Sequence, residues 1–144
     1  MPLAFEPLSL DRQFDYGQIL AATPEVTSDY AFANIWGWAE HYGLEWAFAG
    51  GLIWIRQTRP DLVYWAPMGP WADYRWTECK AVTEAATFTR VPETLARVWK
   101  DAFNGGIRLS AARDHWDYVY SVPDLVALPG EMYRKKHEQL ERFK

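Results

Sequence analysis

Cysteine is nearly missing from this sequence, because Cys79 is the single one. A lone thiol cannot form a disulfide within the chain, and there is no group of thiols that could hold zinc or an iron–sulfur cluster. A single cysteine with no possible disulfide is typical of a protein in a reducing compartment. We therefore expect a cytoplasmic protein.

Long apolar runs are also lacking. No stretch of the sequence reaches the ~18 consecutive apolar residues that a membrane-spanning helix needs. The first residues, MPLAFEPLSLDRQF, contain no basic region followed by an apolar one, which a secretory signal requires. The sequence therefore predicts neither a transmembrane segment nor a leader.

Histidine is too scattered to suggest a metal site. The three histidines are His41, His115 and His137, and none lies three or four residues from another. The acidic stretch with Asp114, Asp117 and Asp124 has fewer oxygen ligands than a calcium loop needs, so turn and cap roles are favoured there. We expect no metal.

No phosphate-binding loop is present either. Acyl-CoA transferases and nucleotide-binding proteins hold phosphates on the backbone amides of a glycine-rich loop that opens a helix. Here Gly50-Gly51 suits a hairpin, Gly105-Gly106 follows a helix, and Gly130 is a single glycine. We expect no cofactor, and a stand-alone acetyl-CoA-dependent transferase is disfavoured. Cys79 lies among residues that look half-buried, which favours packing over nucleophilic catalysis.

Aromatic residues, in contrast, are abundant. They make up 17% of the 144 residues and include nine tryptophans. This length is typical of one domain with one core, and so many large rings argue against disorder. The net charge of −4 argues against whole-surface attraction to nucleic acid or anionic lipid.

The first half of the chain predicts helices followed by a sheet. We expect a short edge strand at 4–7, a helix capped by Ser9, and a second helix that begins near Ser28 or Asp29 and ends at Gly43. The core-facing positions of the first helix are predicted to be Phe14, Ile19 and Leu20. Residues 45–66 then predict a three-stranded meander, turned at Gly50-Gly51.

The second half mixes both kinds of element. Residues 82–86 favour a helix, 86–91 a strand, and a helix opened by Pro92 should end at Asn104. We expect two last strands and a last helix. These are residues 107–113, 116–122 and 131–143. The order indicates an α+β fold with a mostly antiparallel sheet.

Two segments carry a resemblance to a known family. The string DYVYSVPDLVALPGEMYRKKHEQLERFK, together with SDYAFANIWGWAEHYG, resembles an uncharacterised bacterial family related to the C-terminal domain of phosphatidylglycerol lysyltransferase. The matching positions are Asp29, Tyr30, Phe32, Asn34, Trp38, Tyr42, Gly43, Asp117, Tyr118, Tyr120, Leu125, Leu128, Gly130, Tyr133, Lys136, Leu140 and Phe143. His137 and Glu138 depart from the pattern, which usually has Arg-Asn and so a fixed positive charge there.

The resemblance implies a GNAT-like domain. Such proteins are expected to contain two tandem GNAT-like halves, as FemX-type aminoacyl transferases do, and the matched motif belongs to the end of the first half. Residues 1–144 would then be the N-terminal half of an aminoacyl or acyl transferase, inactive alone. Its partner would be a second GNAT-like domain after Lys144, with aminoacyl-tRNA or a lipid as substrate of the full protein.

The resemblance also suggests where a substrate would bind. Tyr118, Tyr120, Tyr133 and Lys136 are the predicted substrate-facing cluster, with packing between the last strand and the last helix as the structural alternative. No catalytic residue is predicted.

A non-catalytic interaction domain is the competing hypothesis. It would use an aromatic surface patch around the 68–73 loop as a docking surface. The patch would consist of Trp65, Pro70, Trp71, Tyr74 and Trp76. This hypothesis requires those rings to be exposed.

Overall fold

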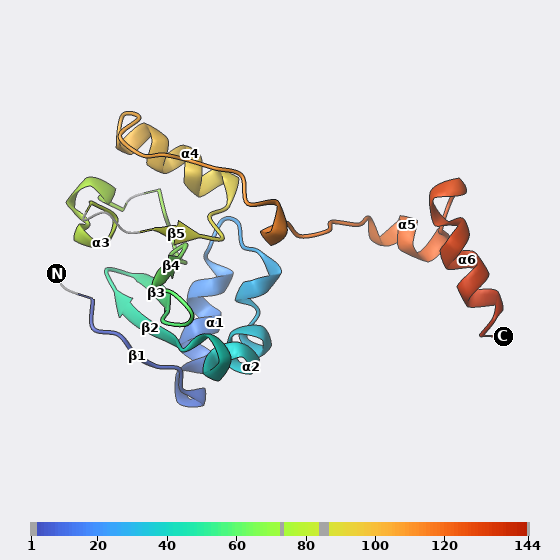
Figure 1. Ribbon diagram of the computed structural model, residues 1–144, viewed down its shortest axis with the longest axis horizontal. Helices are drawn as coiled ribbons and strands as arrows, with labels where there is room; N and C mark the ends of the chain where they lie inside the picture. The colour runs from blue at the N-terminus through green and yellow to red at the C-terminus, as the bar shows by residue number, and fades with distance from the viewer. Residues whose placement is uncertain (1–2, 73, 84–86, 144) are drawn as a thin grey trace.

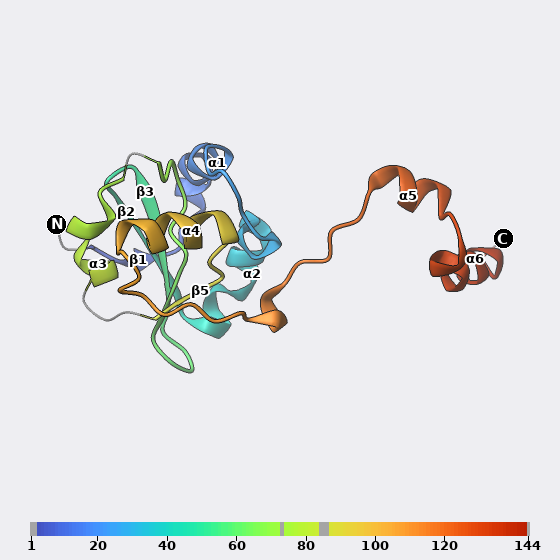
Figure 2. The same ribbon diagram turned by 90° about the horizontal axis from the view of Figure 1, so that it is seen from above.

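The computed structural model describes residues 3–72, 74–83 and 87–143 and has two regions (Figure 1). The body, residues 3–107, contains the sheet and four of the labelled helices. The C-terminal segment, residues 108–143, runs along the body and then leads away from it to a pair of helices, as Figures 1 and 2 show.

A five-stranded sheet forms the centre of the body. Its strands are β1 (Glu6–Pro7), β2 (Leu44–Ala49), β3 (Leu52–Gln57), β4 (Val63–Trp65) and β5 (Phe88–Thr89), and they lie in that order. The first three pairs are antiparallel and β4 pairs with β5 in parallel. The predicted α+β class, with a mixed and mostly antiparallel sheet flanked by helices, is confirmed.

Helices cover both faces of this sheet. The α-helices are α1 (Gln13–Ala21), α2 (Phe32–Tyr42), α3 (Lys80–Thr83), α4 (Glu93–Ala102), α5 (Val122–Ala127) and α6 (Arg134–Glu141). The 3-10 turns are η1 (Leu10–Arg12), η2 (Ser28–Tyr30), η3 (Trp76–Glu78), η4 (Arg113–His115) and η5 (Glu131–Tyr133).

Two tryptophans on neighbouring strands point to opposite faces of the sheet. Trp46 of β2 stacks on Tyr16 of α1 with ring centroids 5.9 Å apart. Trp54 of β3 points to the other face, where it meets Trp76, which in turn contacts Trp99 of α4. Because both faces are covered, β3 is buried at four successive positions, unlike a half-exposed strand.

The predicted turns and caps of the first half are largely confirmed. Gly50 and Gly51 have φ of 63° and 77° in the β2–β3 hairpin, and Gly43 ends α2 with φ of 57°. The Ser9 side chain accepts a hydrogen bond from the Asp11 amide at the start of η1. Glycine adopts positive φ without strain, and a short polar side chain such as serine can accept a hydrogen bond from the first turn of a helix.

The predicted core face of the first helix was wrong at one position. Phe14 is 75% exposed, and the fully buried residue of α1 is Tyr16. Ile19 and Leu20 do pack against the core. Tyr16 can be buried because its hydroxyl donates a hydrogen bond to the Tyr30 carbonyl at 2.7 Å, which satisfies its polar end.

The two last predicted strands are wrong. Residues 107–112 and 116–121 have no regular structure, η4 lies between them, and α5 begins at Val122. A strand needs a neighbouring strand to satisfy its amides and carbonyls, and residues 116–121 lead away from the sheet (Figure 2). Ser121 instead caps α5, accepting a hydrogen bond from the Asp124 amide.

The last predicted helix is present as η5 followed by α6. The longest helix in the described part of the chain is α2, with 11 residues. None of the described helices has the apolar length needed to cross a bilayer.

The proposed aromatic docking patch is also wrong. Trp65, Trp71 and Trp76 are only 2–3% exposed and belong to the core. The indole N–H of Trp71 donates to the Pro67 carbonyl and that of Trp76 to the Trp71 carbonyl, so this loop folds inward.

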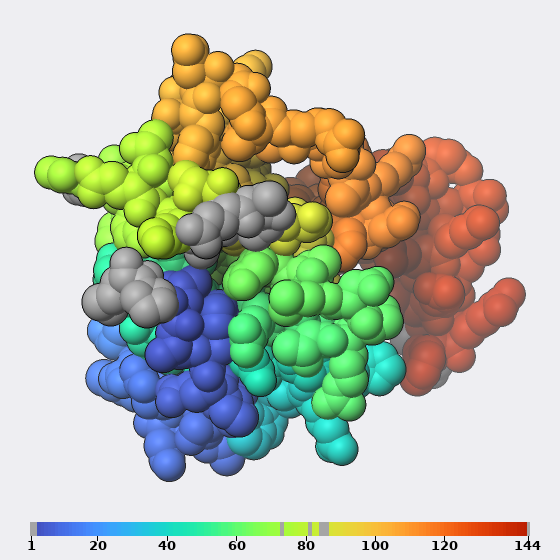
Figure 3. Space-filling view, turned by 60° about the vertical axis from the view of Figure 1, so that its left-hand side comes forward, coloured from blue at the N-terminus to red at the C-terminus, as the bar shows by residue number. Residues whose placement is uncertain are grey.

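Figure 3 shows the body as a filled surface, with the C-terminal helices (red) set back behind it.

Candidate functional site

The two segments that carried the family resemblance meet at η2. The Asp117 carboxylate accepts hydrogen bonds from the Ser28 amide and the Ser28 hydroxyl, both at 2.6 Å. The Asn34 side chain donates to the Ser28 carbonyl at 2.8 Å. Ser28 and Asp117 are 89 positions apart in the sequence, so this serine joins a matched residue of the first motif, Asn34, to one of the last motif, Asp117.

The largely buried side chain of Arg90 forms an ion pair with the same turn. Arg90, which follows β5, lies 3.0 Å from the Asp29 carboxylate, with its guanidinium 4.0 Å from the centre of the Trp65 ring. Its side chain is 11% exposed and its backbone has φ of 54°, which is unusual for a residue with a Cβ. The Tyr30 hydroxyl donates to the Ala66 carbonyl at 2.8 Å.

Burial also changes the acidity of the tyrosines here. Burial raises the pKa of Tyr30 well above its ordinary value, and it does the same for the pKa of Tyr16. Burial, with interaction with the Cys79 thiol, raises the pKa of Tyr74 to about 12. These phenols therefore stay protonated at neutral pH and act as hydrogen-bonding groups.

The predicted substrate-facing residues are spread over the C-terminal segment. Tyr118 and Tyr120 lie on the extended stretch and are 88% and 51% exposed. Tyr133, on η5, is buried, and Lys136, on α6, is exposed. Since residues 116–121 form no strand, the predicted packing of a last strand against a last helix does not occur.

His137 and Glu138, the departures from the family pattern, have structural partners. His137 Nε2 lies 2.8 Å from the Leu128 carbonyl, at the end of α5, so that nitrogen must carry the proton. Glu138 accepts a hydrogen bond from Arg134 at 2.9 Å. The His137 contact joins α6 to the end of α5, and the Arg134 contact lies within α6. We call α5, η5 and α6 the C-terminal helical unit.

The chain that follows β4 has no free backbone amide for a phosphate. Residues 66–70 lie beyond the carboxyl end of the parallel pair β4–β5, where open sheets commonly bind ligands. The amides of Ala66, Met68 and Gly69 donate to Thr89, Ile53 and Thr23. Pro67 and Pro70 have no amide hydrogen.

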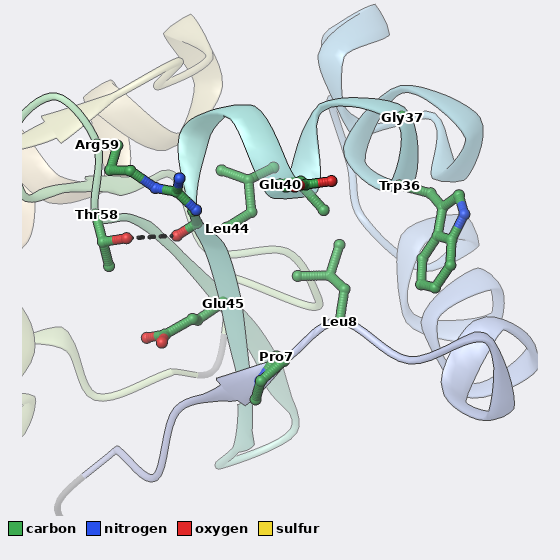
Figure 4. Close-up of a pocket in the computed structure, with 11 residues that line it drawn as sticks. Pro7, Leu8, Trp36, Gly37, Glu40, Leu44, Glu45, Thr58 and Arg59 are labelled. Carbon is green, nitrogen blue, oxygen red and sulfur yellow. Dashed lines mark hydrogen bonds between the residues drawn. The ribbon is translucent and has the colours of Figure 1, made fainter.

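A groove of about 530 Å³ lies between α2, β1 and the start of β2 (Figure 4). Apolar side chains such as Leu8 and Trp36 line it, with Glu40 and Arg59 as charged groups of opposite sign. The Thr58 hydroxyl donates to the Gly43 carbonyl at 2.9 Å across one end. None of the four predicted substrate-facing residues lines this groove.

In the part of the chain that the structure describes, side chains suited to a metal do not gather. Among the described residues, no group of three or more His, Cys, Asp or Glu side chains could hold a metal ion. Asp117 accepts its hydrogen bonds from Ser28, 89 positions away in the sequence, and so has a long-range partner in place of the local turn or cap role predicted for it. Cys79 forms no disulfide and is half-buried.

Comparison with known families now identifies the chain's relatives. Residues 20–144 match the family described as phosphatidylglycerol lysyltransferase, C-terminal. The chain belongs to this family. The match includes both motifs that meet at η2, and the predicted relation to the phosphatidylglycerol lysyltransferase C-terminal domain is confirmed. Comparison with curated proteins gives no match.

One solved structure has a fold similar to that of this chain. It is a conserved protein of unknown function from Bacteroides thetaiotaomicron VPI-5482, with a TM-score of 0.79 at 20% sequence identity. The similarity covers 99% of this chain and 50% of that chain. The chain therefore spans about half the length of that structure.

Proposed function

We propose that this chain is the first GNAT-like half of a tandem aminoacyl or acyl transferase and that it is inactive alone. The observation that carries the proposal is the family match over residues 20–144. The mixed sheet, an antiparallel meander followed by the parallel pair β4–β5, supports a GNAT-like fold.

The second half is proposed to be a GNAT-like domain that packs on the C-terminal segment. Two observations support it. The solved structure with this fold is about twice as long as this chain. The C-terminal segment also exposes large apolar side chains, including Val126 (82%), Met132 (82%) and Phe143 (93%), which a packed domain would remove from water.

Inactivity of the first half is supported by the chain after β4. With the amides of residues 66–70 either paired or absent, this stretch of chain has no backbone donors left to bind the pyrophosphate of an acyl-CoA. We therefore place the donor site in the second half.

The substrate is proposed to be aminoacyl-tRNA or a lipid, used by the complete protein in the cytoplasm. Helix α6 favours an anionic substrate, because Lys135, Lys136 and Arg142 are exposed and make no ion pair with any described residue. Tyr118 and Tyr120 are accessible to the same substrate. The buried Tyr133 would position α6 instead.

The test compares the 144-residue chain with the full product of its reading frame. Each is incubated with radiolabelled Lys-tRNA and phosphatidylglycerol vesicles, and with Ala-tRNA in parallel, and labelled lipid is counted. We expect transfer by the full product and none by the 144-residue chain. Transfer by the short chain alone would contradict its inactivity, and a stop codon directly after Lys144 would contradict the tandem arrangement.

A further inference from the structure

Hydrogen bonds join the C-terminal segment to the body at one residue pair in the described part of the chain. Among the described residues, the hydrogen bonds between residues 3–107 and 108–143 are the two that Asp117 accepts from Ser28. Both are short, at 2.6 Å, and both have a charged acceptor, which makes them stronger than bonds between neutral groups.

The body side of this contact is rigid. Asn34 fixes the Ser28 carbonyl, and the Tyr30 hydroxyl ties the end of η2 to Ala66 in the core. Arg90 pairs with Asp29, which lies next to Ser28 in the sequence, and so reduces the repulsion that a second carboxylate would meet on approaching this turn. Ser28 therefore offers two donors in a fixed position and a favourable field.

The segment side, in contrast, is loose. The residues that flank Asp117 are mostly solvent-exposed, Trp116 by 63%, Tyr118 by 88% and Val119 by 92%. Little apolar surface is buried around the contact, so breaking it would lose few interactions other than the two hydrogen bonds. Regions with few buried contacts open at low free energy while the rest of a protein stays folded.

We propose that Asp117 and η2 form a releasable clasp that sets the position of the C-terminal helical unit relative to the body. With the clasp closed, the chain leaves the body at Asp117 and the unit lies as Figures 1 and 2 show. With it open, the unit moves freely on the extended stretch while the body stays folded. The clasp is a property of this chain and does not depend on a second half or on a transferase activity.

The test measures hydrogen exchange and backbone relaxation by NMR on the 144-residue chain. Asp117→Ala removes both acceptors, and Asp114→Ala, at an acidic side chain without a hydrogen-bonded partner among the described residues, is the matched control. In Asp117→Ala we expect the Ser28 amide to exchange about tenfold faster, the effect of one lost charge-assisted hydrogen bond. Amides of α6 should show faster independent tumbling, while those of β2 and β3 keep their protection.

Ser28→Ala and Asp117→Asn separate the two bonds. Ser28→Ala keeps the amide donor and loses the hydroxyl donor, and Asn keeps one acceptor oxygen, so both variants should fall between wild type and Asp117→Ala. Two results would overturn the proposal. One is unchanged exchange at Ser28 and unchanged tumbling of α6 in Asp117→Ala. The other is loss of β2–β3 protection in that variant, which would make Asp117 a folding residue of the body.

Discussion

The body and the C-terminal segment use the same kinds of residue in opposite ways. In the body, Trp46 and Trp54 are fully buried on the two faces of the sheet. In the C-terminal segment, Trp116 and Phe143 are 63% and 93% exposed. Aromatic content alone therefore does not say where a core lies, because burial also requires a second surface to pack against.

The two regions also differ in what holds them together. Body contacts are long-range and apolar, such as the ring contacts that join Trp54, Trp76 and Trp99 across η3 and α4. The C-terminal helical unit is held by short-range contacts, such as the 2.8 Å contact of His137 with Leu128, and has only two buried apolar side chains among its described residues, Leu128 and Tyr133. We therefore expect the body to be the stable unit and the segment to respond to local changes.

Truncation of a large ring should separate the regions most clearly. Trp54→Ala leaves a large cavity between β3 and η3 and should lower the free energy of unfolding by about 3–5 kcal/mol. Phe143→Ala removes an exposed ring and should change it by less than about 0.5 kcal/mol. Urea unfolding followed by circular dichroism measures both. A comparable loss in Phe143→Ala would show that the segment contributes to the core.

Alkaline pH should weaken the body through its buried tyrosines. Because burial raises the pKa of Tyr16 and Tyr30, both remain protonated in the folded state while they ionise in the unfolded state above about pH 10. Stability is therefore complete below pH ~10 and falls as the pH rises, by up to about 1.4 kcal/mol per pH unit for each tyrosine.

Tyr16→Phe tests this assignment. It should lower stability at pH 7 by about 1–2 kcal/mol, because the Tyr30 carbonyl loses its donor. It should also reduce the slope of stability against pH above 10, measured from urea midpoints at pH 9, 10 and 11. An unchanged slope would mean that Tyr16 is not a source of the alkaline loss.

His137→Ala should act only within the C-terminal helical unit. It leaves the Leu128 carbonyl without its partner and should destabilise the contact between α5 and α6 by about 1 kcal/mol. Hydrogen exchange in α6 should quicken while that of β3 does not change. His115→Ala, at a half-buried histidine of η4, is the control, and equal effects of the two variants would contradict the assignment.

Gly17→Ala should give the smallest effect, and a stabilising one. Gly17 lies on the exposed face of α1, and a Cβ there would have no atom within 4 Å. Alanine should raise the unfolding free energy by about 0.5–1 kcal/mol. Gly43→Ala is the contrasting variant, because Gly43 has φ of 57° and its Cβ would collide with Thr58. Thermal unfolding of the two variants should shift in opposite directions.

Features determined by local chemistry could be predicted from the sequence. The Gly50-Gly51 hairpin, the end of α2 at Gly43 and the cap at Ser9 each depend on neighbouring residues only. The helix α4 and its glycine-rich end were also predictable, because its apolar positions repeat with helical spacing.

Features that depend on distant partners could not be predicted in the same way. Residues 116–122 alternate like a strand, but alternation does not show whether another strand is available to pair. Trp65, Trp71 and Trp76 surround a loop rich in proline and glycine, and distant elements help to bury them, since Trp65 packs on Tyr30 of η2 and Trp76 on Trp99 of α4. The bond between Ser28 and Asp117 joins two polar residues of ordinary type, so composition gave no signal for it.

The position of Asp117 in the chain has a consequence for how the protein is made. Ser28 is synthesised early, whereas Asp117 follows every residue of the body. During synthesis the body can therefore complete its sheet before the carboxylate that binds η2 has left the ribosome, since domains generally fold as units from the N-terminus. The bond between Ser28 and Asp117 closes a long loop, and η2 is already formed when it closes. Attachment of the C-terminal segment is therefore a late step in folding.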